Sequence, residues 1–244
     1  MIFLNAAIKG SAITKRCVWK TLQLANHSTL RLSGVMSEGA SPQPKAKDTS
    51  PTTLPIRFST SLKHPEVVAE GVRWLAIYKP PGWSVGPVEG SDETPSLHTV
   101  YTAALEAANL FFPLRINRDI AGLTLACTDR GMNAQFSRHL RDGLIKRKYR
   151  ALCHHNESLV IEPPLHISRN GNHLCLVDID ATKMRGRELL ELLQSRGLEL
   201  VDKPKVSVQL HQLVFPDPTN PGSGDTIVIE MSLPEEWEDL FISD

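Results

Sequence analysis

Three polar residues at alternate positions of one short stretch could do chemistry together. The stretch is PLRINRDIAGLTLACTDRG, residues 113–131, and the three residues are Arg115, Asn117 and Asp119. A carboxylate can act as a nucleophile or as a base, whereas a neutral amide supplies no negative charge. The small residues that follow are typical of an active-site loop between two strands. Which of these side chains would do the chemistry is therefore the first question that the sequence raises.

Apolar spacing predicts the elements that would position this loop. Residues 73–79 form an apolar, aromatic run suited to a buried strand, which the following proline pair must end. A second strand is predicted at 122–128. Asp129 can cap a helix that stops at Gly143, and a strand through Tyr149 to Cys153 should follow.

The remaining pattern mixes helices and strands without strict alternation. Helices are predicted within 96–112 and 186–197, and strands within 173–183 and 206–215. Residues 215–234 are predicted to form a strand, a Pro- and Gly-rich turn and another strand. Neighbouring strands without a helix between them favour an α+β fold with a mixed, mainly antiparallel sheet and packed helices.

The composition is that of a globular protein and names no partner. Hydrophobic residues make up 41% and charged residues 22%, with a formal net charge of zero. No apolar run approaches the roughly 20 residues that span a bilayer, so no membrane partner is predicted. The four cysteines are scattered, and the adjacent His154 and His155 would point to opposite faces of a strand. We therefore predict neither a metal site nor a cofactor.

The first 55 residues differ from the rest of the chain. Residues 1–37 contain five basic residues and no acid, which is typical of a mitochondrial targeting segment and implies a location in the matrix. A disordered, merely basic tail is the alternative. Residues 38–55 are rich in Ser, Thr and Pro and are predicted to be a disordered linker. The folded domain is then residues 56–244.

Four stretches, in this order, resemble the RluA-type pseudouridine synthases, which isomerise uridine to pseudouridine in RNA. LAIYKPPGWSV resembles the opening strand and lysine–proline turn of that family, and RINRDIAGLTLACT resembles its catalytic loop, HRLDxxTSG. IKRKYRALC is similar to its basic strand with a tyrosine, and LHQLVFPDPTNPGSGDTIVIEMSLPEEW to its C-terminal hairpin. The resemblance covers about residues 70–240 and implies a pseudouridine-synthase-like fold.

The resemblance fails at the residue on which the family's chemistry depends. Arg115 matches the loop arginine and Gly122 the loop glycine, but Asn117 occupies the place of the catalytic aspartate. The polar histidine, threonine and serine of the pattern are replaced by Leu114, Ile120 and Ala121. Asp119 is the alternative carboxylate, although a shift of two residues along the loop displaces it by several ångströms.

Two other family positions are less sharply matched. The motif GRTHQIR falls near residues 184–197, where Leu190 occupies the place of its arginine unless Arg185 or Arg187 supplies the guanidinium. Tyr149 matches the tyrosine that lies against the target base, and a plain core residue is the alternative. The degenerate site is thus Arg115, Asn117, Asp119 and Tyr149, with no confident catalytic residue.

Basic residues gather just after the loop. Six lie within residues 138–150, where Asp142 is the only acid. Clustered Lys and Arg supply the electrostatic part of RNA binding, and a solvated helix face is the alternative. The predicted RNA-binding residues are Lys79, Arg115, Arg138, Arg141, Lys146, Arg147, Lys148 and Arg150.

These observations lead to one predicted function and two alternatives. The first is a catalytically inactive pseudouridine synthase homologue that binds rRNA or ribonucleoprotein in mitochondrial large-subunit assembly. The second is an active synthase that uses Asp119. The third is a protein-interaction subunit that pairs with an active paralogue, for which the acidic C-terminus PEEWEDLFISD would be a docking segment rather than a solvated tail.

Overall fold

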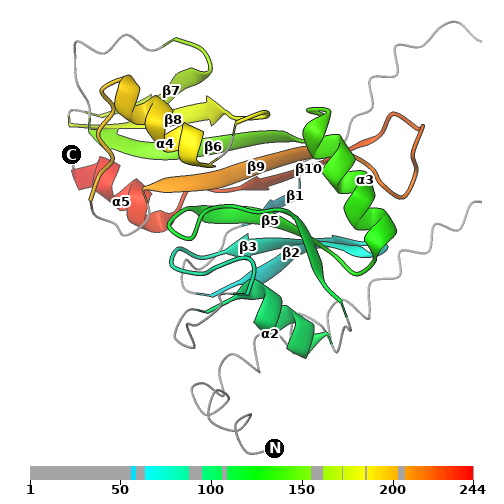
Figure 1. Cartoon of the computed structure of the whole chain (residues 1–244). Helices are drawn as coiled ribbons and strands as arrows, with labels where there is room; N and C mark the ends of the chain where they lie inside the picture. The colour runs from blue at the N-terminus through cyan, green and yellow to red at the C-terminus, as the bar shows by residue number, and fades with distance from the viewer. Residues whose placement is uncertain are drawn as a thin grey trace, which may run out of the picture. The chain divides into compact units, whose positions relative to one another are not determined.

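A computed structural model describes residues 56–58, 64–87, 95–105, 109–154, 162–171, 173–184, 186–202 and 207–243. All of them lie in one unit, Thr53–Asp244 (Figure 1). The predicted targeting segment and linker, residues 1–55, lie outside the described residues. The described helices and strands are, in chain order, β1 (Ile56–Phe58), β2 (Glu66–Gly71), β3 (Trp74–Lys79), α2 (Leu97–Ala104), β4 (Phe111–Leu114), β5 (Ala121–Cys127), α3 (Arg130–Arg141), β6 (Lys146–His154), β7 (Leu165–Asn170), β8 (Leu174–Asp180), α4 (Gly186–Ser195), β9 (Val208–Pro216), β10 (Thr226–Met231) and α5 (Glu235–Ser243).

The strands form one ten-stranded mixed sheet. Its main path runs β2-β3-β5-β9-β6-β8-β7, while β4 pairs with β5, and β10 joins β9 to β1. Among the pairings of the described strands, β5–β9 and β1–β10 are parallel and the others are antiparallel. The predicted α+β fold with a mainly antiparallel sheet is confirmed.

A cluster of three aromatic side chains packs α3 against the sheet. Phe136 of α3 lies edge-on to Trp74 of β3 and to Phe215 of β9, with ring centroids 6.5 and 5.5 Å apart, and Trp74 and Phe215 are 5.4 Å apart. Such edge-to-face pairs add stability beyond the area that they bury. In Figure 1 the helix lies along one side of the sheet, beside β9 and β5. Its inner face is therefore fixed.

The predicted start and end of α3 are confirmed by its caps. The Asp129 side chain accepts a 2.8 Å hydrogen bond from the Met132 amide, which satisfies one of the free N–H groups of the first turn. At the other end Gly143 takes a left-handed φ of 72°, as glycine commonly does after a helix.

Two predicted elements differ from the structure. The helix expected within 96–112 ends at Ala104, and Phe111–Leu114 forms the strand β4 instead. The apolar residues of that strand face a buried environment in either conformation, so their spacing did not distinguish the two. The C-terminal segment is not a solvated tail: it forms α5, whose Trp237 is fully buried.

Cysteines 127, 153 and 175 are buried free thiols. Within the described part of the chain, no helix is both long and apolar enough to cross a membrane.

Candidate functional site

The loop between β4 and β5 is tied to the turn that follows β3. The Lys79 ammonium donates hydrogen bonds to the carbonyls of Pro80, Trp83 and Arg118, at 3.1, 3.0 and 3.0 Å. The Gly82 amide also donates to the Arg118 carbonyl, at 2.9 Å, and the Arg118 guanidinium returns a 3.1 Å bond to the Gly82 carbonyl. Of these five hydrogen bonds, the three that involve Arg118 join the loop to Lys79 and to the turn that follows it.

Lys79 is part of the interior. Its side chain is fully buried, and this burial lowers the pKa of the ammonium to about 7, although the nearby Asp119 carboxylate raises it. The prediction that Lys79 contacts RNA is therefore not kept. A buried ammonium with three carbonyl acceptors holds the loop and has no surface to offer a phosphate.

The polar side chains of the loop point outward, and its apolar side chains point inward. Arg115, Asn117 and Asp119 are exposed, while Leu114 and Ile120 are buried. The guanidinium of Arg115 lies against Gly86, where a Cβ would be 3.7 Å from Nη1. Within the described residues Arg115 and Asp119 form no ion pair. The predicted loop residues therefore lie on one exposed segment, but the Asp119 carboxylate and the Arg115 guanidinium do not contact each other.

A row of cross-strand neighbours connects the end of the loop to Tyr149. Gly122 lies opposite Lys79 on one side and opposite Leu210 on the other, and Leu210 lies opposite Tyr149. Gly122 has a φ of 123°, and a Cβ there would be 2.3 Å from the Leu210 carbonyl oxygen. Only glycine fits at this approach of two backbones. The loop glycine of the sequence pattern is thus explained by packing.

Tyr149 is part of the core. It is 2% exposed, and burial raises its pKa above the usual range. Tyr149 lies in the same row of cross-strand neighbours as Lys79, and three strand spacings, roughly 14 Å, separate the two residues. The described conformation therefore does not present the ring to a base.

The basic cluster divides into exposed and half-buried members. Arg138, Arg141, Lys146 and Lys148 are exposed, whereas Arg147 and Arg150 are half-buried. Along β6 successive side chains point to opposite faces, so Lys146, Lys148 and Arg150 lie on the face opposite Arg147 and Tyr149. The sequence cluster is not one continuous surface.

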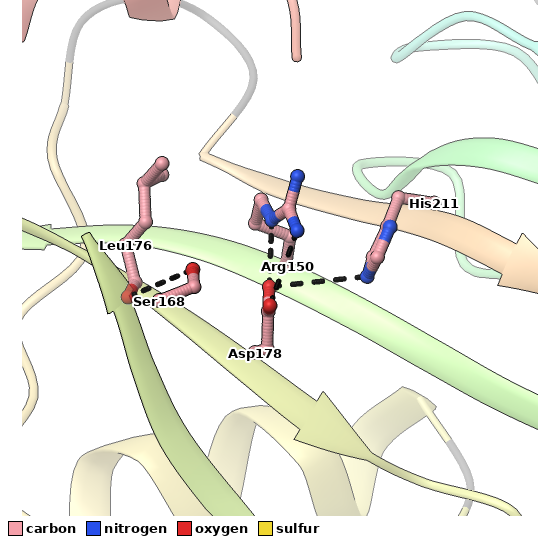
Figure 2. A network of polar contacts seen from close by, with 5 residues as sticks. All are labelled: Arg150, Ser168, Leu176, Asp178 and His211. Carbon is pink, nitrogen blue, oxygen red and sulfur yellow. Dashed lines mark hydrogen bonds and ion pairs between the residues drawn. The ribbon is translucent and has the colours of Figure 1, made fainter. Parts of the chain in front are cut away.

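Arg150 belongs to a polar network on the sheet. Its guanidinium donates two hydrogen bonds to the Asp178 carboxylate of β8, at 2.6 and 3.1 Å (Figure 2). The Nε2 atom of His211 is 3.8 Å from the same carboxylate. Burial alone would raise the pKa of Asp178, but the hydrogen bonds from Arg150 lower it. Asp178 and His211 were missed from the sequence because their role depends on strand pairing.

His211 is buried and neutral. Its pKa is lowered to about 4, chiefly by burial and in addition by the Arg150 charge, while the Asp178 charge opposes the shift. It is the extra residue of an irregularity in the β6–β9 pairing, where Lys148 is opposite Gln212 but Tyr149 is opposite Leu210. The network therefore lies beside the bulge that brings Leu210 to Gly122.

Arg147 holds the turn that precedes α4. Its guanidinium donates to the carbonyls of Thr182 and Met184, at 2.9 and 2.8 Å. This contact places Lys183, an exposed residue that the sequence analysis did not select, beside Gly143, where a Cβ would be 3.2 Å from the lysine Cε.

The α4 segment supplies no arginine to the loop in the described conformation. Arg187 forms an exposed ion pair with Glu191, at 2.9 Å. Leu190 is half-buried, and Arg185 lies outside the described residues.

The fold is that of a pseudouridine-synthase-like protein. Two solved structures share it. The first, "Human RNA Pseudouridylate Synthase Domain Containing 4", is 12% identical in sequence, with a TM-score of 0.53 over 72% of this chain and 90% of that chain. The second, "Human RNA Pseudouridylate Synthase Domain Containing 1", is also 12% identical, with a TM-score of 0.55 over 72% of this chain and 86% of that chain. No family model matches the sequence, and no curated protein matches it. The likeness is therefore one of fold.

Proposed function

We propose that this chain is a catalytically inactive pseudouridine synthase homologue of the RluA type. It binds rRNA or ribonucleoprotein in the mitochondrial matrix and takes part in assembly of the large ribosomal subunit.

Asn117 carries this proposal. The framework around it is that of a positioned loop, because Lys79 holds the Arg118 carbonyl and Gly122 fits against Leu210. The position that needs a carboxylate nevertheless has an amide, which has no anionic oxygen to attack a substrate. The neighbouring positions that carry polar groups in the family pattern are the buried Leu114, Ile120 and Ala121. These contacts position the loop, and the amide at Asn117 supports the proposal that the loop is inactive.

RNA is the partner that the fold and the surface favour. Both structures named above are RNA pseudouridylate synthase domain proteins by name, and exposed basic side chains gather on α3 and on the first half of β6. Lys and Arg that neutralise phosphates release counterions, which favours binding of any RNA. The mitochondrial location rests on the acid-free basic composition of residues 1–37. The assembly role rests on that location together with the habits of the family.

An active enzyme that uses Asp119 is the alternative with an observation in its favour. Asp119 is exposed on the loop, close enough to Lys79 to influence the pKa of the ammonium. Pairing with an active paralogue through the acidic C-terminus has less support, because α5 buries Trp237 in this chain's own core.

A pull-down of the full chain from isolated mitochondria, with RNA and protein both identified, tests the proposal. We expect large-subunit rRNA and ribosomal proteins to be enriched, and a reporter fused to residues 1–37 to enter mitochondria. Recovery of protein partners that persists after RNase treatment, with no RNA enriched, would refute RNA binding. Cytosolic retention of the reporter would refute the location.

A further inference from the structure

The outward face of α3 contains arginine and small residues only. The exposed residues of the helix cover about 120° of its circumference at 100° per residue. They are Arg130, Gly131, Ala134, Ser137, Arg138 and Arg141. No acid occurs between residues 130 and 141. The face is therefore uniformly positive over a helix roughly 18 Å long.

The opposite face of α3 keeps this surface turned outward. Met132 and Phe136 are buried, and Phe136 is edge-on to Trp74 and Phe215. Rotation of the helix would break these ring contacts. The three arginines are thus presented from a rigid element, which reduces the entropy lost on binding.

The arginine charges are largely free of internal counter-charges. Neither Arg130 nor Arg138 forms an ion pair with another residue that the structure describes. Arg141 lies 3.7 Å from Asp142, but both side chains are largely exposed, at 73% and 47%. Exposed pairs of this kind contribute little to stability. All three guanidinium groups are therefore available to bind an external anion.

The residue types on this face indicate which kind of anionic partner it would bind. Gly131 has no side chain and Ala134 and Ser137 have short ones, which permits close approach of a backbone, and the serine hydroxyl can donate to a phosphate oxygen. The face contains no aromatic residue, whereas proteins that bind single strands stack bases on aromatic rings. Double-stranded RNA is recognised through its backbone and its shape. A phosphate backbone fits the face better than unpaired bases do.

We infer that the outward face of α3 binds the phosphate backbone of double-stranded RNA without reading its sequence. The inference rests on the proposed function and specifies where, and to which class of RNA, the chain binds. Two further exposed lysines lie beyond the helix: Lys183, against the turn at Gly143, and Lys146, at the start of β6. The degenerate loop is not part of this contact.

Two charge-matched variants of the full chain test the inference. Arg130, Arg138 and Arg141 are changed to Gln in the α3 variant, and Arg169, Arg187 and Arg196 are changed to Gln in the control variant. Both lose three positive charges. Affinity for a 20-base-pair RNA duplex of arbitrary sequence is measured from 50 to 300 mM KCl, with thermal unfolding to confirm folding.

We expect the α3 variant to bind the duplex at least roughly tenfold more weakly at 100 mM salt. Its log–log salt slope should be smaller by about 2 to 3, since each duplex phosphate contact contributes about 0.9. The control variant should stay within about twofold of the wild type. Changing the three arginines to Lys should retain most of the slope, and Ala134→Glu, an exposed single change, should weaken binding without unfolding the chain.

Three results would overturn the inference, and they differ in what they leave standing. Equal loss in the α3 and control variants would move the RNA site elsewhere while RNA binding by the chain remained. Retained duplex binding combined with lost binding to poly-glutamate would make the face a docking site for an acidic protein. Absence of RNA binding by the wild type would remove the inference and the proposed function together.

Discussion

The Lys79 ammonium donates a 3.0 Å hydrogen bond to the carbonyl of Arg118, 39 residues further along the chain. The bond joins the turn after β3 to the loop before β5, although the loop lacks the carboxylate that chemistry at Asn117 would require. The side chains that shape the loop are those of Lys79 and Arg118, and Asn117 contributes its backbone carbonyl, which accepts a 3.2 Å hydrogen bond from the Ile120 amide.

Lys79→Met should destabilise the chain by about 2 to 4 kcal/mol, because the Pro80 and Trp83 carbonyls lose the donor that Lys79 supplies and the Arg118 carbonyl keeps the Gly82 amide alone of its two donors. The free energy of unfolding by urea at pH 6, where the ammonium is charged, measures the effect. Lys183→Met, at an exposed lysine, is the control and should change stability by less than about 0.5 kcal/mol. Equal effects of the two changes would contradict the role given to Lys79.

Gly122→Ala should prevent stable folding or cost several kcal/mol, since a Cβ would be 2.3 Å from the Leu210 carbonyl oxygen and the φ of 123° is strained for alanine. Gly197→Ala is the matched control. Its φ is 68°, but no atom lies within 4 Å of the added Cβ, so we expect a cost of about 1 kcal/mol. Soluble yield and thermal midpoint compare the two. A Gly122 variant as stable as the Gly197 variant would show that β5 and β9 can separate.

Acidification should destabilise the wild type through His211. Its pKa is about 4 in the folded chain against an ordinary 6.5, so between these values the unfolded chain binds a proton that the native chain does not. The free energy of unfolding must then fall as the pH falls from 6.5 to 4, by up to about 1.4 kcal/mol per pH unit. His211→Gln removes this contribution. Parallel pH profiles for the two proteins would show that His211 is charged in the native state.

Substitution of Lys146 and Lys148 should weaken RNA binding, whereas substitution of Arg147 should lower the stability of the chain. The double change Lys146→Ala and Lys148→Ala removes two exposed charges, so the salt slope for duplex RNA should decrease and the unfolding free energy should stay within about 0.5 kcal/mol. Arg147→Ala leaves the Thr182 and Met184 carbonyls without their donor and should cost about 1 to 3 kcal/mol. The reverse pattern would contradict the division between exposed and half-buried basic residues.

Local signals in the sequence were enough to predict much of the fold. The cap at Asp129 and the stop at Gly143 define α3, and the buried run before the proline pair defines β3. Phe111 and Phe112 were placed in a helix because apolar residues at a short interval fit both periods. β7 was missed because five of its six side chains are exposed or half-buried, which leaves little apolar alternation to detect.

The candidate site was predictable where it depends on local chain order. Arg115, Asn117 and Asp119 are neighbours in sequence and share one exposed loop. The burial of Lys79, the bond from Arg150 to Asp178 and the position of His211 depend on which strands pair and in which register. A list of basic residues could not separate Lys146, which faces solvent, from Arg147, which holds a turn.

The most direct test of the central claim is pseudouridine mapping of total and mitochondrial RNA incubated with the purified wild-type protein. We expect the RNA to be bound and no pseudouridine to form. Asn117→Asp is expected to restore at most a trace of turnover, because Arg115 is in place but Ile120 and Ala121 still lack polar groups, and positioning errors of about 1 Å can cost 10²-fold. Robust modification by the wild type that vanishes in Asp119→Ala would contradict the account and establish Asp119 as the catalytic carboxylate.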